Sequence, residues 1–279
     1  MIARQIANAH TTFNITMTLI WLPLIGIMVK IVMKLIPDGK GDIVDKKAPL
    51  YLDEKIMNQP AAALKLVTRE VLHCNDIVKE MFTKTTEVVT VREEKVINQL
   101  REEGRTVRNL YDSIMEYLAN LFSAGVLTEE QATQTAGLMY ILSDIDRMGS
   151  LCTQIGENVR ESLERGYKYS EEAIRDVEKS LELIQDMYQK SMQMLENGEV
   201  NQEDVESILN HKDDILNLDI YMRKSHMNRV NQGKCRPEMT GRFTRILHII
   251  NRMGNACTDM MDAAVSKINF QYFLGTTEE

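Results

Sequence analysis

The chain has 279 residues, of which 44% are hydrophobic, 27% charged and only 6% aromatic, and its formal net charge is −8. This acidic balance, without basic residues interleaved with aromatic ones, argues against nucleic acid as a partner. Four cysteines without a CxxC pair argue against a metal finger and indicate reduced thiols, and 18 methionines suit the adaptable cores of long helices.

The first segment, residues 1–36, is predicted to be a transmembrane helix. Residues 5–29 contain no Asp, Glu, Lys or Arg, and their second half, ITMTLIWLPLIGIMV, is strongly apolar. About 20 such residues cross a bilayer, and the absence of a small-residue cleavage pattern argues against a signal peptide. Notable residues in this segment are Asn8, His10, Asn14 and Pro23.

The lysines that follow this segment predict its orientation. Five of them lie between positions 30 and 47, against Arg4 and the amino terminus on the other side. By the positive-inside rule, the chain after the span faces the cytoplasm. We therefore expect the protein at the cell membrane, with residues 37–279 cytoplasmic.

Residues 37–60 are predicted to be a linker, because Pro, Gly and alternating charges fill them and Pro60 can begin a helix. Beyond the linker, the apolar spacing predicts six long helices. Thr128 with Gln131 forms a capping box for the third helix. The helices are expected over about residues 61–86, 92–122, 128–166, 170–197, 201–233 and from 237 onward.

An internal repeat groups these helices into threes. RMGSLCT at residues 147–153 returns as RMGNACT at residues 252–258, and apolar or small residues recur around both copies at helical spacing. The glycine inside each copy suggests close approach of another helix. We expect an all-α protein with two similar three-helix bundles, residues 61–166 and 167–279, packed side by side.

Several stretches resemble a known family. DIDRMGSLCTQIGENV and IINRMGNACTDM are similar to the two copies of the PhoU helix signature. RKSHMNRVNQGKCRPEMT resembles the run before the second copy in PhoU-like domains fused to sodium/phosphate cotransporters. RQIANAHTTFN and APLYLDEKIMNQPAAAL resemble the end of that transporter's membrane part and its junction. The chain is thus identified as the C-terminal part of a sodium/phosphate cotransporter family protein: its last membrane helix and a PhoU-like domain.

This resemblance implies a regulatory function rather than an enzymatic one. The expected function is a cytoplasmic PhoU-like domain that modulates phosphate uptake by a sodium-dependent cotransporter. Transport by this chain alone is not expected, because it lacks the two inverted repeats with Gln-Ser-Ser-type motifs that form the family's transport path. Two alternatives remain: a membrane-tethered phosphate-signalling adaptor that acts on a separate transporter or sensor kinase, and a metal-binding helical bundle.

The resemblance also implies metal sites, which are degenerate here. The family places acidic pairs one helical turn apart, and the matching positions are Asp146 with Ser150 and Asn251 with Asn255. Only one of these four side chains is a carboxylate, and neutral Ser or Asn lacks the charge that holds a di- or trivalent cation. We expect no cofactor, with a weak divalent or iron site as the alternative.

A basic cluster is the predicted docking surface. It comprises Arg223, Lys224, Arg229, Lys234 and Arg236. These side chains are expected to be exposed, and to meet either the membrane domain of a phosphate transporter or anionic lipid. The alternative is that they complement a helix C-terminus. A second copy of the chain is a further candidate partner.

Overall fold

The computed structural model of the protein describes residues 10–21, 48–125 and 127–275. Two compact units are distinguished, Met1–Lys46 and Lys47–Glu279. In the first unit, residues 10–21 form a helix, and the Asn14 side-chain amide lies 3.1 Å from Nδ1 of His10 one turn earlier. Asn8 and Pro23 of the predicted membrane segment lie outside the described residues.

Within the ranges described, no helix combines the length and the apolar character needed to span a bilayer. The predicted span, residues 5–29, extends beyond residues 10–21 on both sides. The membrane helix therefore stays a prediction.

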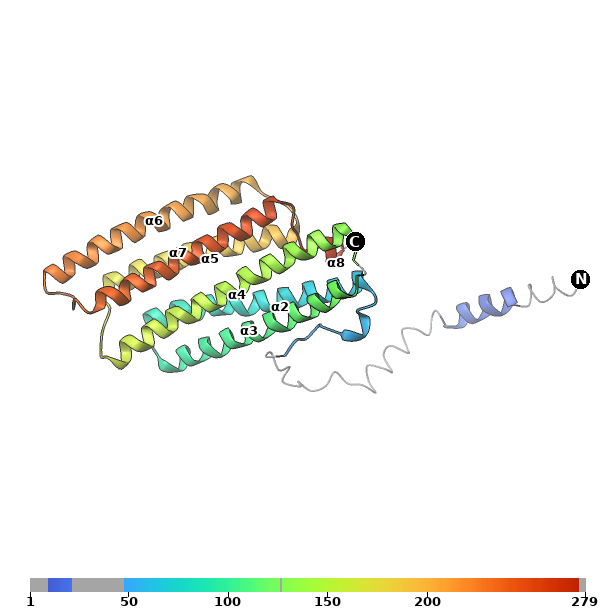
Figure 1. The fold of residues 1–279 in the computed structure, drawn as a ribbon, viewed down its shortest axis with the longest axis horizontal. Helices are drawn as coiled ribbons and strands as arrows, with labels where there is room; N and C mark the ends of the chain where they lie inside the picture. Colours follow the sequence, from blue (N-terminus) through green and yellow to red (C-terminus); the bar gives the residue numbers. More distant parts are fainter. Residues whose placement is uncertain (1–9, 22–47, 126, 276–279) are drawn as a thin grey trace, which may run out of the picture. The chain divides into compact units, whose positions relative to one another are not determined.

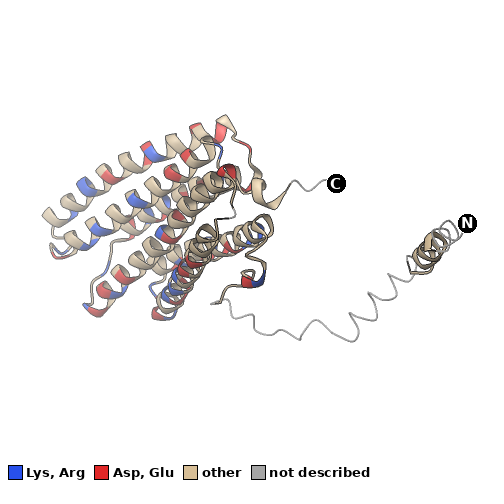
Figure 2. Ribbon diagram, turned by 45° about the vertical axis from the view of Figure 1, so that its right-hand side comes forward, with Lys and Arg blue, Asp and Glu red and all other residues tan. Residues whose placement is uncertain are grey.

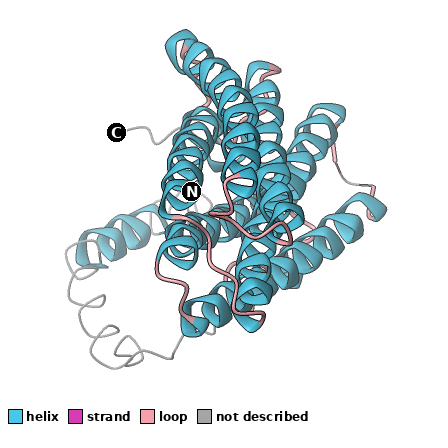
Figure 3. Ribbon diagram, turned by 90° about the vertical axis from the view of Figure 1, so that its left-hand side faces the viewer, coloured by secondary structure: helices cyan, strands magenta, loops and turns pink. Residues whose placement is uncertain are grey.

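The second unit is built from helices, and no strand occurs among its described residues (Figures 1 and 3). Six of these helices are long, as predicted. The elements are η1 (Glu54–Ile56), α2 (Pro60–Thr90), α3 (Glu94–Ser123), α4 (Glu129–Glu164), α5 (Glu171–Asn197), α6 (Gln202–Asn231), α7 (Met239–Val265) and α8 (Gln271–Leu274).

The predicted helix ends are largely confirmed, because short-range capping sets them. Thr128 and Gln131 form both hydrogen bonds of a capping box, and Gly198 ends α5 with φ +71°. The predicted end of the first helix at residue 86 is too early. Val88 and Val89 are buried and carry α2 on to Thr90.

The six long helices pack in two groups of three. Helices α2, α3 and α4 pack on one another, as do α5, α6 and α7, and the groups meet where α4 lies along α7 and α2 along α5. One cluster of buried apolar side chains runs through both groups. Residues of both charge signs are distributed along the helices (Figure 2).

The repeated glycines differ in their surroundings. A Cβ added at Gly149 would lie 3.2 Å from Val107 Cγ1, which is tighter than ordinary contact. At Gly254 the nearest atom would be 3.5 Å away, on Ile184. The predicted close helix approach is therefore present at Gly149, whereas Gly254 has ordinary van der Waals contact.

The described end of the predicted linker, residues 48–59, is not a free tether. The backbone N–H groups of Leu50 and Tyr51 donate to the buried carboxylate of Glu70, at 2.8 and 2.6 Å. The Tyr117 hydroxyl donates to the carbonyl of Asp53 at 2.8 Å. The chain therefore enters the bundle along a defined path over α2 and α3, and Glu70 supplies the acceptor that holds it.

Candidate functional site

The predicted metal positions of the first repeat, Asp146 and Ser150, lie in a groove of about 390 Å³ between α3 and α4. Gly104 lets the two helices come close there, because a Cβ at this position would collide with Oγ1 of Thr153. The groove is lined by Arg101, Gly104, Arg105, Arg108, Asn109, Asp146, Ser150, Thr153, Gln154 and Glu157.

Asp146 is already paired with an arginine side chain. The Arg108 guanidinium lies 2.7 Å from its carboxylate, and Asp146 is only 7% exposed. Burial raises the pKa of Asp146, Arg108 opposes that rise, and the nearby Asp112 adds to it. The single carboxylate that remains from the predicted ligand set is thus held by an arginine of the neighbouring helix.

The other end of the groove is also occupied by ion pairs. Glu157 accepts hydrogen bonds from Arg101 at 2.7 Å and from Arg160 at 2.6 Å. Burial opposes ionisation of Glu157, but these bonds outweigh it and lower its pKa. Guanidinium groups bind oxyanions rather than metal cations, so the groove does not fit the metal that the resemblance implies.

The matching positions in the second repeat, Asn251 and Asn255, carry no carboxylate. The Asn251 side chain donates to the carbonyl of Leu247 at 3.0 Å, and Asn255 is exposed. In the part of the chain that the structure describes, no three His, Cys, Asp or Glu side chains are placed to hold a metal ion. A weak divalent or iron site stays a prediction.

These contacts predict how metal binding would respond to substitution. Ser150→Asp alone is expected to raise metal binding little, because Arg108 still neutralises Asp146. Combining Ser150→Asp with Arg108→Ala is expected to raise retained zinc or iron at least about tenfold, because two carboxylates one turn apart are then free. Elemental analysis of the full chain, purified without chelator, measures this.

The matched control combines Ser150→Asp with Arg105→Ala, because Arg105 pairs with Glu102 rather than with Asp146. Stoichiometric metal in the unaltered protein that is lost on Asp146→Ala would contradict the expectation.

One member of the predicted docking cluster is buried rather than exposed. Arg229 was expected to be exposed but is 7% exposed. It lies seven residues after Met222, on the stripe of α6 that faces the core. Its guanidinium donates to the Ser225 hydroxyl at 2.6 Å and lies 3.2 Å from the carboxylate of Glu172 on α5. Helical position therefore turns Arg229 inward, and Glu172 neutralises it.

The other four members of the cluster remain at the surface to different degrees. Arg223 is half-buried and donates two hydrogen bonds to Asp219, at 2.9 and 3.0 Å. Arg236 lies over the Tyr167 ring, 5.8 Å from its centroid. Lys224 and Lys234 are exposed. Lys234 and Arg236 remain together at the connection between α6 and α7.

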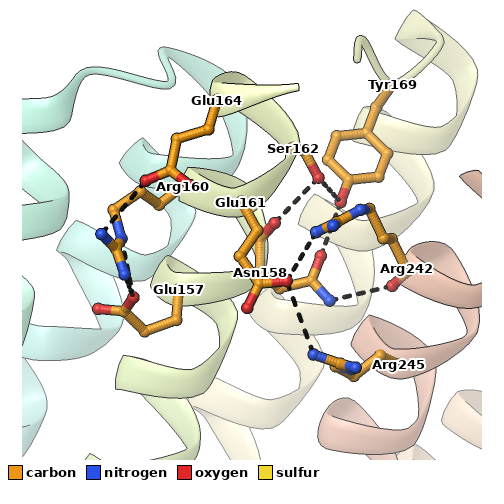
Figure 4. A network of polar contacts seen from close by, with 9 residues as sticks. All are labelled: Glu157, Asn158, Arg160, Glu161, Ser162, Glu164, Tyr169, Arg242 and Arg245. Carbon is orange, nitrogen blue, oxygen red and sulfur yellow. Dashed lines mark hydrogen bonds and ion pairs between the residues drawn. The ribbon is translucent and has the colours of Figure 1, made fainter. Parts of the chain in front are cut away.

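A polar network across the two repeats was not predicted (Figure 4). Asn158 of α4 is buried, donates to the backbone carbonyl of Arg242 on α7 at 3.2 Å and accepts from the Tyr169 hydroxyl at 2.8 Å. Arg242 also pairs with Glu161 at 2.8 Å. Asn158 and Arg242 are 84 positions apart, so no local pattern in the sequence indicates the contact.

Comparison with known proteins shows similarity to a domain family and to a curated protein. Residues 71–159 match the PhoU domain, and this range runs from within α2 to the last turns of α4. The chain is also 23% identical over 194 residues to the "Putative inorganic phosphate export protein YjbB" of Salmonella typhimurium. That alignment covers 68% of this chain and 35% of the relative, so the chain spans about a third of the relative's length.

Proposed function

We propose that residues 47–279 are a regulatory domain of a phosphate transporter. The premise is that this chain is a PhoU-domain protein related to phosphate transport proteins. The observation that carries this proposal is the PhoU match on α2–α4, together with similarity over 68% of the chain to a protein named for phosphate export. The proposed role is not enzymatic.

The architecture supports regulation rather than transport by this part of the chain. Its long helices pack around one shared core of apolar side chains. A transport path needs polar groups arranged across a bilayer, usually at the junction of two repeats within the membrane. A packed bundle can instead change transport by binding one transporter state better than another.

The finer parts of the proposal are sodium dependence, direction and location. The resemblance in the sequence favours sodium-dependent uptake, whereas the relative is named for export, and regulation of gating is compatible with either. The location proposed is the cell membrane, with residues 37–279 on the cytoplasmic side. That placement rests on the apolar stretch at residues 5–29 and on the lysines after it.

The docking surface proposed for the transporter or its lipid is the pair Lys234 and Arg236. Both side chains are exposed in the connection between α6 and α7. Cations so placed attract an acidic loop or anionic headgroups by about 1 kcal/mol each. Such contacts weaken with salt, because exposed charges are screened.

Reversing both charges, Lys234→Glu with Arg236→Glu, is expected to change cellular phosphate flux about two- to tenfold. The attraction becomes repulsion, while neither side chain contributes to the core. Uptake and efflux of labelled phosphate, each with and without sodium, are measured in cells that express the full-length protein with the cognate transporter.

The control, Arg69→Glu with Lys95→Glu, changes the net charge equally at two other exposed positions. Unchanged uptake, unchanged efflux and unchanged co-purification with the transporter would place the docking surface elsewhere. Co-purification with a sensor kinase but not with a transporter would favour the adaptor alternative.

A further inference from the structure

The outer face of α6 carries an apolar stripe that the bundle does not bury. Leu209, Leu216, Ile220 and Met227 are 46%, 53%, 60% and 48% exposed. Their spacings of seven, four and seven residues place them on one face of the helix, over about 27 Å. Single exposed apolar residues are ordinary on a protein surface, but a row of four along one helix indicates an interaction surface.

The first repeat shows that the bundle does not require this stripe. In α3, the core positions are Leu100, Val107, Ile114 and Leu121, and in α6 the corresponding positions 108 residues later are Ile208, Ile215, Met222 and Arg229. At the same offset, the stripe of α6 corresponds to Arg101, Arg108, Asp112 and Ala119 of α3. The equivalent face of the first repeat is therefore mostly charged, so the apolar residues of α6 serve something other than the fold.

Two charged residues of opposite sign lie within the stripe, one near each end. Asp213 lies between Leu209 and Leu216, and Lys224 lies between Ile220 and Met227; both are exposed. Read from either end, the face is apolar, charged, apolar, apolar, charged, apolar, and the two charges have opposite sign. Such a pattern is complementary to itself when a second copy runs in the opposite direction.

We propose that α6 pairs with α6 of a second copy of this chain, antiparallel about a two-fold axis level with Leu218. This arrangement places Leu209 against Met227 of the partner subunit, Asp213 against the partner's Lys224, and Leu216 against the partner's Ile220. Each contact occurs twice, as in an isologous dimer. The apolar residues form the seam, and the ion pairs select the antiparallel direction.

The charges also favour a second copy over a lipid surface as the occupant. A face buried in anionic headgroups would bring Asp213 into a region of like charge. Against a second copy, both Asp213 and Lys224 find an opposite charge. This interface does not depend on the proposed regulatory function.

The first test measures the mass of the full chain in detergent micelles by light scattering after size-exclusion chromatography. The unaltered chain is expected to be a dimer. Leu216→Arg introduces the residue found at the equivalent position of α3 and is expected to weaken association at least about 30-fold. Tyr140→Arg is the matched control, because Tyr140 on α4 is 52% exposed, as Leu216 is 53% exposed.

The second test exchanges the two charges. Asp213→Lys alone and Lys224→Asp alone are each expected to weaken the dimer, because each sets like charges against each other. The double exchange is expected to restore association. A zero-length carbodiimide cross-link between Asp213 and Lys224 is also expected, and it must join two copies, because eleven helical residues separate the two side chains by about 16 Å within one chain.

A monomer at all concentrations, a dimer indifferent to Leu216→Arg, or failure of the double exchange to restore association would each overturn the proposal. A monomeric chain whose vesicle binding or transporter binding is lost on Leu216→Arg would also overturn it, and would assign this face to that other partner.

Discussion

Replacing Tyr188 by Ala is expected to lower the free energy of unfolding by about 3–5 kcal/mol, the range for removing a large aromatic side chain from a core. Tyr188 of α5 is 1% exposed and lies where the two repeats meet. Its ring centroid is 5.1 Å from that of Phe82 on α2, and its hydroxyl donates to Asn75 at 2.8 Å. The substitution would leave a cavity between the repeats and would remove a partner of a buried amide.

The hydroxyl and the ring of Tyr188 can be separated by a second variant. Burial raises the pKa of Tyr188 well above its ordinary value, so the hydroxyl stays protonated and acts as a donor. Tyr188→Phe keeps the ring and is expected to cost about 1–2 kcal/mol, because Asn75 Oδ1 then loses its donor. Urea unfolding of the full chain, followed by helical circular dichroism, measures both variants.

The other end of the Asn75 amide keeps its partner in Tyr188→Phe, because Nδ2 still donates to Glu196 at 3.0 Å. Equal losses for Tyr188→Ala and Tyr188→Phe would show that the hydrogen bond, rather than ring packing, joins the repeats. A loss below about 1 kcal/mol for Tyr188→Ala would contradict the packing of α2 on α5.

Asp144→Asn is expected to stabilise the protein at neutral pH, by at most about 3 kcal/mol. Asp144 is 5% exposed at the contact of α4 with α7, and its Oδ1 lies 2.7 Å from Arg147. Its Oδ2 has no hydrogen-bond partner among the described residues. Burial raises the pKa of Asp144 from 3.8 to about 6, with Arg147 opposing and Asp259 adding to the rise.

The pH dependence follows from the raised pKa. Between about pH 4 and pH 6 the folded state holds a proton on Asp144 that the unfolded state has released, so this group's contribution to stability falls as the pH rises. The gain in the free energy of unfolding from Asp144→Asn should therefore be close to zero below pH 4 and should reach its full size above pH 6. Urea unfolding of both proteins at a series of pH values measures the difference directly.

Asp259→Asn is the control. Asp259 is more exposed than Asp144 and pairs with the same Arg147 at 2.5 Å. Its removal is expected to lower stability by no more than about 1 kcal/mol, as for other partly exposed ion pairs. A gain from Asp144→Asn that is independent of pH would contradict the assignment to burial of the carboxylate.

Helix number, helix ends and the internal duplication follow from the sequence because short-range interactions decide them. The capping box at Thr128 joins residues three apart, and the apolar stripes repeat every three or four residues. The Met and Cys positions of RMGSLCT and RMGNACT are buried, as their place in that repeat predicted. The degenerate state of the metal motif could likewise be predicted, since it depends only on which residue types occupy four positions.

The contacts of charged side chains depended on tertiary structure. From the sequence, Asp146 is the one carboxylate at the four predicted metal positions, and Arg229 is expected to be exposed. In the fold, Arg108 pairs with Asp146 and Glu172 pairs with Arg229. Each pair joins two helices, so its formation depends on how those helices pack, which no pattern of neighbouring residues encodes. Helix α6 shows the same limit, because it has apolar residues on two faces and periodicity alone cannot tell which face is buried. Packing against α5 and α7 covers the face with Ile208, Ile215 and Met222, and it leaves Leu209, Leu216, Ile220 and Met227 at the surface.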